Sequence, residues 1–138
     1  MFYEVGCGLG RVVCDVARRR VERVVGIELC AELASVAELN ASRVRGRLAS
    51  VEIRTGDAAE AVYDGGTVYF MFNPFGAATM SAVMDRIRES LERDPRQIRI
   101  VYMNPLHDEV LSRQPWLVRR DAFKLRGFRS GTHIYESC

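Results

Sequence analysis

The stretch that decides the fold reads Glu4-Val5-Gly6-Cys7-Gly8-Leu9-Gly10 and occupies residues 4–10 of a chain of 138 residues. It follows the β-rich run at residues 2–5, which predicts a strand. It precedes residues 11–20, whose apolar positions have helical spacing. Three glycines in five residues let the chain turn sharply and let a ligand approach the backbone without a Cβ in the way. The stretch therefore predicts a ligand-binding turn between a first strand and a first helix.

Short β-rich runs and amphipathic helical runs alternate along the rest of the chain. Further strands are predicted at residues 23–27, 50–54, 67–72 and 98–103, and further helices at 31–44, 79–91 and 108–113. Because strands that alternate with helices form parallel sheets, this order predicts an α/β fold with helices on both faces of a mostly parallel sheet. Two last strands, at 122–126 and 132–136, are joined by residues 127–131, a connection short enough for a C-terminal antiparallel hairpin.

Length and composition predict a single domain over residues 1–138, with an apolar fraction of 48% and a net charge of +2. No apolar run reaches the ~20 residues needed to cross a bilayer, and the start of the chain lacks the features of a signal peptide. We therefore expect a cytoplasmic protein without membrane contact. The four cysteines lack the paired short spacing of zinc sites and only two histidines occur, so no metal site is expected.

The basic residues are nearly all arginine, and Lys124 is the one lysine. The run Arg18-Arg19-Arg20 falls at the predicted end of the first helix, where cations interact favourably with the helix dipole. We interpret it as a solvated helix terminus and the preference for arginine as the composition of a GC-rich genome. An arginine-based recognition surface is the alternative.

The glycine turn and the end of the second strand together predict an adenosine-containing ligand. Glu28 ends the second strand 18 residues after Gly10, where a carboxylate accepts hydrogen bonds from both hydroxyls of a ribose. A dinucleotide fingerprint would place a third glycine at position 11, which is Arg11. S-adenosylmethionine (SAM) instead carries an ammonium and a sulfonium, which suit a carboxylate near the turn, and Glu4 is placed to help directly or through water.

These residues resemble the motifs of the class I SAM-dependent methyltransferases. The acid-x-G-x-G-x-G motif is matched by Glu4, Gly6, Gly8 and Gly10, the ribose-binding acid by Glu28, and the adenine-contacting Gly-Asp by Gly56-Asp57. Ala37 and Asn40 resemble the A-x-x-N of the intervening helix. The resemblance implies a Rossmann-like three-layer sandwich, SAM as the cofactor and S-adenosyl-L-homocysteine as the product. It implies cofactor-binding roles for Glu4, Gly6, Cys7, Gly8, Gly10, Glu28, Leu29, Gly56, Asp57, Ala58 and Asn73.

The end of the fourth strand carries Asn73-Pro74-Phe75, where substrates of open α/β sheets bind. The tripeptide resembles the Asn/Asp-Pro-Pro-Tyr/Phe motif of methyltransferases that act on amino nitrogens of bases or amides, with one proline missing. A second resemblance is to the Asn-Asn-Phe of seven-strand histone-lysine methyltransferases. The first resemblance implies catalytic roles for Asn73, Pro74 and Phe75; the alternative is a structural turn with Phe75 in the core.

The acceptor of the methyl group is left open among protein, small molecule and nucleic acid. His107 and His133 are candidate bases for an acceptor that arrives protonated. Family members carry helices ahead of the first strand, which here begins almost at Met1. We therefore expect either a truncated start or a site completed by a partner chain, with a homo-oligomer covering the open sheet. A noncatalytic methyltransferase-like interaction subunit and an NAD-binding Rossmann domain are the alternative functions.

Overall fold

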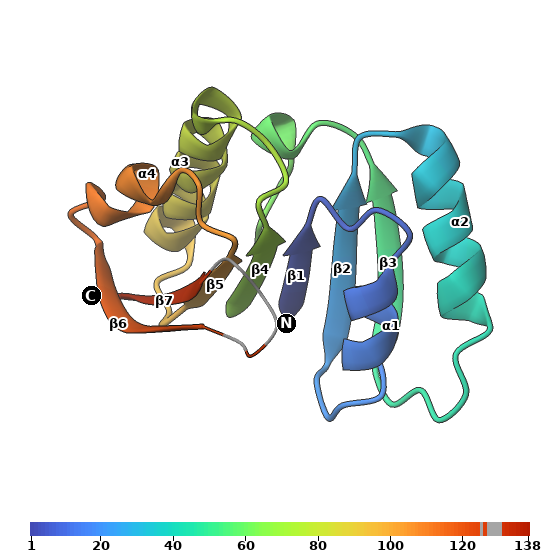
Figure 1. Ribbon diagram of the computed structural model, residues 1–138. Helices are drawn as coiled ribbons and strands as arrows, with labels where there is room; N and C mark the ends of the chain where they lie inside the picture. Colours follow the sequence, from blue (N-terminus) through green and yellow to red (C-terminus); the bar gives the residue numbers. More distant parts are fainter. Residues whose placement is uncertain (125, 127–130) are drawn as a thin grey trace.

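The computed structural model describes residues 1–124, 126 and 131–138, which form one seven-stranded sheet with helices on both faces (Figure 1). The strands are β1 (Phe2–Val5), β2 (Arg23–Glu28), β3 (Ser50–Thr55), β4 (Val68–Phe72), β5 (Arg99–Met103), β6 (Leu117–Lys124) and β7 (Gly131–Ser137). The helices are α1 (Arg11–Val16), α2 (Ala31–Ser42), α3 (Ala77–Arg93) and α4 (Asp108–Ser112), with a short 3-10 helix η1 (Ala58–Glu60).

The strand order β3-β2-β1-β4-β5-β7-β6 places β1 at the centre of the sheet. Strands β1 to β5 are parallel, and β7 runs antiparallel to both β5 and β6. The chain moves to one side of β1 for β2 and β3 and to the other side for β4 and β5. The order therefore reverses between β1 and β4, the switch point at which ligands bind in such sheets. The expected α/β, Rossmann-like fold with a terminal antiparallel hairpin is confirmed.

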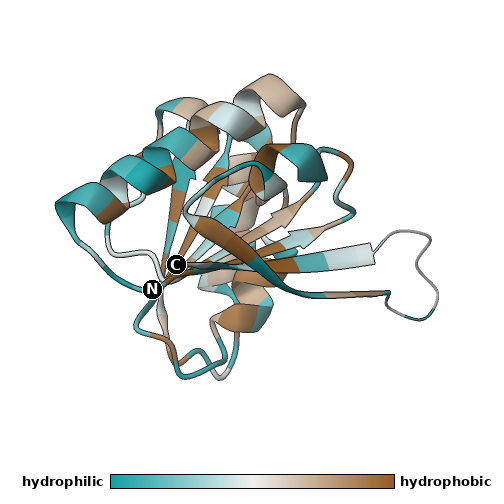
Figure 2. Cartoon of the chain, turned by 90° about the vertical axis from the view of Figure 1, so that its left-hand side faces the viewer, coloured by the Kyte–Doolittle hydropathy of each residue, from teal (hydrophilic) through white to brown (hydrophobic). Residues whose placement is uncertain are grey.

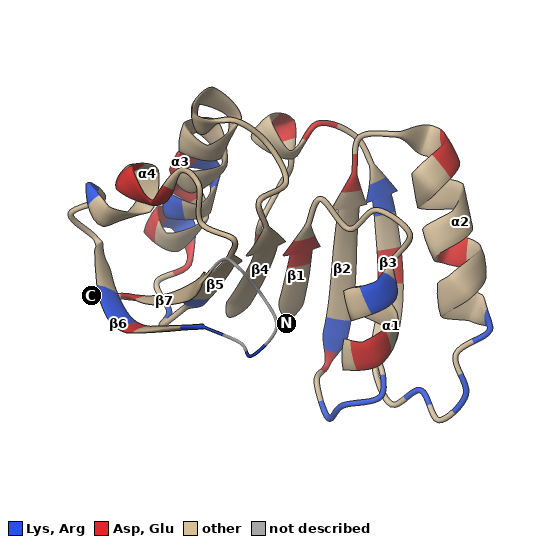
Figure 3. Ribbon diagram, in the orientation of Figure 1, with Lys and Arg blue, Asp and Glu red and all other residues tan. Residues whose placement is uncertain are grey.

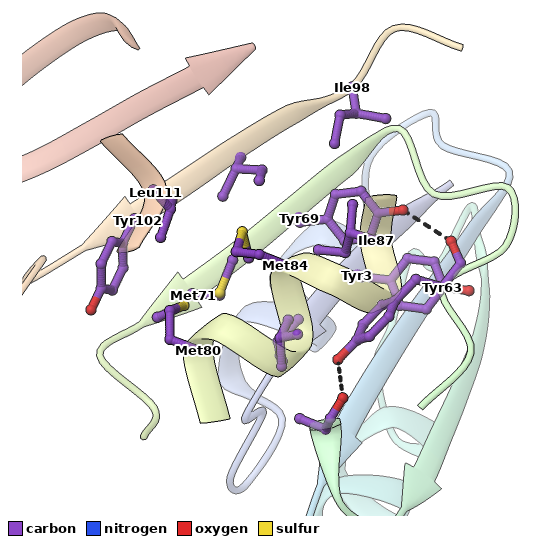
Figure 4. Packing of buried hydrophobic residues seen from close by; sticks show 14 of the residues in the cluster. Tyr3, Tyr63, Tyr69, Met71, Met80, Met84, Ile87, Ile98, Tyr102 and Leu111 are labelled. Carbon is purple, nitrogen blue, oxygen red and sulfur yellow. Dashed lines mark hydrogen bonds between the residues drawn. The ribbon is translucent and has the colours of Figure 1, made fainter. Parts of the chain in front are cut away.

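The larger core lies between the sheet and α3, η1 and α4. Alternate side chains of β1, β2, β4, β5 and β7 point to this face, and α3 meets them with Met80, Val83, Met84 and Ile87. Tyr3, Tyr63 and Tyr69 pack with ring centroids 5.4–5.8 Å apart (Figure 4). The Tyr63 hydroxyl donates to the Ala58 carbonyl at 2.8 Å, so this core fixes the segment that follows β3.

The opposite face is covered only in part. Helices α1 and α2 pack over β1, β2 and β3, where Val13, Val24 and Ala37 are fully buried. Beyond β1, the side chains of Phe70 in β4 and of Val101 and Met103 in β5 are only partly buried on this face, and Phe72 is 49% exposed. The β6–β7 hairpin reaches beyond the helical layers (Figure 2). No helix in the described residues is long and apolar enough to cross a membrane.

The first helix is shorter than expected. It ends at Val16 rather than at residue 20, because the Ala17 carbonyl accepts the amides of Leu48 (2.8 Å) and Ala49 (3.1 Å) from the loop before β3. Arg18-Arg19-Arg20 therefore follow the end of α1 instead of forming its last turn, and all three are exposed, as expected of a solvated helix terminus.

The terminal hairpin is longer than expected. Strand β6 begins at Leu117, five residues before the expected start, and pairs with β7 from Leu117 opposite Ser137 to Lys124 opposite Gly131. All of β6 except Leu117 is exposed, so its residues lack the alternation that marks a strand in a sequence. Residue 125 of the predicted strand and residues 127–130 of its connection lie outside the described residues, and Gly131 begins β7.

Candidate cofactor and acceptor site

The turn between β1 and α1 depends on glycines in the left-handed region. Gly6, Gly8 and Gly10 have φ of 78°, 52° and 75°, which non-glycine residues rarely adopt. A Cβ on Gly6 would lie 2.5 Å from the Cβ of Pro74, so the turn and the end of β4 are in close contact there. A Cβ on Gly8 would meet nothing within 4 Å, so this glycine borders open space at the carboxyl edge of the sheet.

Glu28 organises the carboxyl end of β2. Its Oε2 accepts the backbone amide of Gly8 at 2.8 Å and its Oε1 accepts that of Cys30 at 3.0 Å. A carboxylate has about four lone-pair positions, so two acceptor positions remain for a ligand. Leu29 follows with 71% of its surface exposed. The carboxylate thus links the glycine turn of β1 to the strand end where a ribose is expected.

Glu4 lies behind the turn. It is 7% exposed, and its Oε2 accepts the amide of Val13 in the first turn of α1 at 2.9 Å. Burial, helped by the nearby Glu28 carboxylate and opposed by the Val13 hydrogen bond, raises the pKa of Glu4 to about 7. The structure therefore shows Glu4 bonded to α1, and its role as a cofactor ligand stays a prediction.

Cys7 also lies in the interior. Its amide donates to the Ile27 carbonyl at 2.9 Å and its thiol is buried beside Gly26. Burial raises the pKa of the Cys7 thiol to about 12, so the side chain is a packing group, and the Cys7 carbonyl accepts the Gly10 amide at 2.8 Å within the turn.

The end of β3 completes the cofactor side. The amide of Gly56 donates to the Glu28 carbonyl at 2.9 Å, and Asp57 Oδ1 caps η1 by accepting the Ala59 amide at 2.9 Å. One cleft of about 190 Å³ brings together most of the expected residues: Gly6, Glu28, Leu29, Gly56, Asp57, Ala58, Pro74 and Phe75. A neighbouring cleft of about 490 Å³ shares Gly56 and Asp57.

Two residues of the cleft were not expected from the sequence. Ile27 and Thr79 line it together with the expected residues. Thr79 was expected to begin its helix, but α3 starts at Ala77, so Thr79 lies in the first turn beside the end of β4. Gly76, the N-cap of α3, is the signal that could have placed the helix start correctly.

The end of β4 holds an unsatisfied polar atom. Asn73 has φ of 39°, its amide donates to the Met103 carbonyl at 3.1 Å, and its side-chain Oδ1 is buried without a hydrogen-bond partner in the described structure. Pro74 and Phe75 line the cleft, and Phe75 also packs against the main core. The next strand ends in the same way, because Asn104 precedes a proline and has φ of 52°. The two asparagines therefore stand at neighbouring strand ends.

The two histidines lie away from the cleft. His133 Nδ1 is 2.6 Å from Asp108 Oδ1, and the same oxygen accepts the Tyr135 hydroxyl at 2.7 Å. The His107 amide donates to the Tyr102 hydroxyl at 3.2 Å. Neither histidine lines the clefts that contain the expected cofactor residues. Within the described residues, no group of three or more Cys, His, Asp and Glu side chains could hold a metal ion.

Comparison with known proteins shows which family and which solved structures the chain is similar to. A family model described as a methyltransferase domain matches residues 3–96. No curated protein matches the chain. An RNA methyltransferase from Salinibacter ruber, solved with S-adenosyl-L-homocysteine, has a similar structure, with a TM-score of 0.65 and 24% identity over 99% of this chain and 78% of that one.

Two further structures show the same fold at lower identity. TrmN from Thermus thermophilus has a TM-score of 0.72 and 16% identity over 99% of this chain and 43% of its own. A TehB-like SAM-dependent methyltransferase from Corynebacterium glutamicum has a TM-score of 0.66 and 17% identity, over 99% of this chain and 79% of its own. Matches at this identity extend the fold assignment beyond residue 96 to nearly the whole chain.

Proposed function

The chain belongs to the methyltransferase-domain family and uses SAM, and on this premise we propose that it transfers the methyl group to a nitrogen of an acceptor bound beside Asn73. The observation that carries the choice of nitrogen is the buried Asn73 Oδ1, which has no partner in the described structure. An unsatisfied buried acceptor costs roughly 1–3 kcal/mol. The N–H of an acceptor amine would satisfy it and would be aligned by it.

The donor set of the cleft fits SAM. Glu28 has two lone-pair positions left for the two ribose hydroxyls, and Gly8 leaves open space for the ligand to approach the backbone. Asp57 Oδ1 caps η1, which leaves Oδ2 for the exocyclic amine of adenine. Glu4 supplies negative charge behind the turn for the ammonium or sulfonium. We assign the remaining expected ligands, Gly6, Cys7, Gly10, Leu29, Ala58 and Asn73, to backbone and apolar contacts.

The bound cofactor supplies a methyl group on a positively charged sulfur. Asn73 Oδ1 holds the N–H of the acceptor so that the nitrogen lone pair faces that methyl, and Phe75 offers a ring for a planar acceptor. The nitrogen–carbon bond forms as the sulfur–carbon bond breaks, and the nitrogen releases its proton to solvent. Positioning at roughly 3–3.5 Å in line supplies most of the rate enhancement.

The acceptor class is not selected by the fold alone. The similar structures include a methyltransferase of RNA and one of magnesium protoporphyrin IX. The local chemistry at Asn73, Pro74 and Phe75 favours a planar amine, as found in nucleobases and amides. A noncatalytic role and an NAD-binding role are the alternatives that the experiment must separate.

The test combines ligand binding with methyl transfer. We expect calorimetry to show micromolar binding of S-adenosyl-L-homocysteine and none of NAD. Glu28→Gln should weaken this binding roughly 10- to 100-fold, because it removes the charge from hydrogen bonds worth about 1.5–3 kcal/mol. Glu38→Gln, at an exposed position of α2, is the matched control and should bind like the wild type.

Asn73→Ala tests the acceptor side. With tritiated SAM and a panel of RNA, DNA and protein acceptors, we expect this variant to lower turnover about 100-fold through misplacement of the acceptor. Tight cofactor binding without transfer to any member of the panel would favour the noncatalytic role. Binding of NAD in place of S-adenosyl-L-homocysteine would refute the proposal.

A further inference from the structure

Six exposed arginines gather at the edge of the sheet where the parallel strands begin. Residues 17–22 connect α1 to β2 and residues 43–49 connect α2 to β3. We call the six arginines of these two loops the arginine edge; they are Arg18, Arg19, Arg20, Arg43, Arg45 and Arg47, all exposed. The loops contain one acid, Glu22, so they carry a net +5 in a chain of net +2, and the remainder carries −3. In the ribbon of Figure 3 the loops below α1, α2 and β2 are mostly blue, for Lys and Arg, whereas the upper ends of β1 and β2 are red, for Asp and Glu.

Hydrogen bonds hold the two loops side by side. The amides of Leu48 and Ala49 donate to the Ala17 carbonyl at 2.8 and 3.1 Å, and Arg18 Nε donates to the Arg45 carbonyl at 3.3 Å. The Ser50 hydroxyl donates to the Glu22 carbonyl at 3.2 Å. The arginines therefore form one continuous surface although the loops are separated by α2 in the sequence.

The arginines of this edge lack the carboxylate partners that several arginines elsewhere in the described residues have. In the residues that the structure describes, none of the six forms an ion pair with a carboxylate. Arg88, Arg93 and Arg120, in contrast, pair with Asp85, Asp64 and Glu136. Neighbouring like charges repel and oppose the compact state, so an external anion would stabilise this surface. The helix dipoles favour cations directly at the ends of α1 and α2, where Arg18 and Arg43 stand, but Arg20, Arg45 and Arg47 lie further along the loops.

The chemistry of the edge fits a chain of phosphates. The guanidinium group presents a planar fork of donors that matches phosphate in two hydrogen bonds. The two loops contain no aromatic residue that could stack on a base. Contacts would therefore be made to the sugar–phosphate backbone and would not depend on the base sequence. Leu48, 64% exposed, is the one strongly exposed apolar side chain of these two loops. A single side chain offers too little apolar area to insert into a bilayer.

We propose that the arginine edge binds the sugar–phosphate backbone of a nucleic acid. The edge and the Asn73 end of the sheet lie at opposite ends of the parallel strands, roughly 20 Å apart for strands of this length. A polymer can contact both ends at once, whereas a single nucleotide cannot. The binding itself does not depend on methyl transfer; its use in presenting an acceptor to Asn73 rests on the proposed function.

The test measures the salt dependence of binding to a labelled single-stranded RNA of about 20 nucleotides by fluorescence anisotropy. Six phosphate contacts predict a slope of log K against log salt of about −4, a loss of roughly 300-fold between about 50 and 200 mM. The triple variant Arg18→Gln, Arg19→Gln, Arg45→Gln should reduce the slope to about −2. The matched control Arg88→Gln, Arg93→Gln, Arg120→Gln removes the same charge from ion-paired positions and should keep the wild-type slope.

Each outcome decides the proposal. Equal weakening by the two triple variants would show that net charge and not this edge binds RNA. Absence of binding to RNA and DNA at about 50 mM salt, or binding only to phosphatidylserine vesicles, would overturn it. Melting temperature and S-adenosyl-L-homocysteine binding, measured on the same samples, should be unchanged in both variants. Failure of the proposed function would appear in cofactor binding or in methyl transfer and would leave the salt dependence of RNA binding unchanged.

Discussion

Glu4 offers a prediction that tests the buried side of the cofactor turn. Its carboxylate is 7% exposed, accepts the Val13 amide and lies near the Glu28 carboxylate. Burial raises the pKa of Glu4 from 4.5 to about 7. A buried ionised carboxylate destabilises the folded state, and such charges are typical of binding sites that receive a cation.

The sign and size of the effect follow from the pKa. Between pH 4.5 and about 7 the folded protein keeps a proton that the unfolded chain releases, so the free energy of unfolding falls as the pH rises. One pKa unit corresponds to about 1.4 kcal/mol, so the total loss is about 3 kcal/mol, complete above pH 7. The carboxyls with lowered pKa, Glu32, Glu52 and Glu136, contribute stability that is lost only as the pH falls below about 4.5.

Glu4→Gln removes the titration and keeps an oxygen for the Val13 amide. We expect urea unfolding to give similar free energies for variant and wild type at pH 5, and a variant more stable by about 2–3 kcal/mol at pH 8. Glu38→Gln, which removes an exposed carboxylate of α2, should follow the wild-type pH dependence. If Glu4→Gln also follows it, the carboxylate is not held in a buried, proton-binding state and the reasoning is refuted.

Two further predictions concern the turn and the open sheet face. Gly6→Ala should destabilise the fold by roughly 2–4 kcal/mol and abolish S-adenosyl-L-homocysteine binding, because its Cβ would meet Pro74 at 2.5 Å and φ is 78°. Gly8→Ala, with open space around its Cβ, should lower the free energy of unfolding by only about 1–2 kcal/mol in thermal or urea unfolding. Equal losses of stability in the two variants would contradict the clash between position 6 and Pro74. Because Phe72 is 49% exposed on the uncovered face of β4, we expect dimerisation in light scattering that weakens in Phe72→Ser. A wild type that stays monomeric at high concentration would exclude this interface.

The local pattern of the chain was sufficient to predict the glycine turn and the strand ends that we propose for the cofactor. Positive φ values at positions 6, 8 and 10 favour glycine, so the spacing of these three glycines is by itself enough to indicate the turn. Glu28 and Asp57 directly follow or end β-rich runs, and strand ends of a parallel sheet meet at one edge. The alternation of strands and helices likewise predicted the parallel sheet, because each βα unit is specified by residues close in sequence.

Other features depend on contacts between distant segments, and only the tertiary structure decided them. The Ala17 carbonyl accepts amides from residues 48 and 49, which ends α1 four residues early and turns two separate loops into the arginine edge. Strand β6 exists because β7 supplies its hydrogen bonds, and its exposed residues carry no periodicity of their own. That Asn73 Oδ1 has no hydrogen-bond partner within the described residues could be recognised only from the placed donors around it. Sequence therefore determined the elements that local propensity and spacing specify, and the fold determined which of their ends, charges and polar atoms remain available to a ligand.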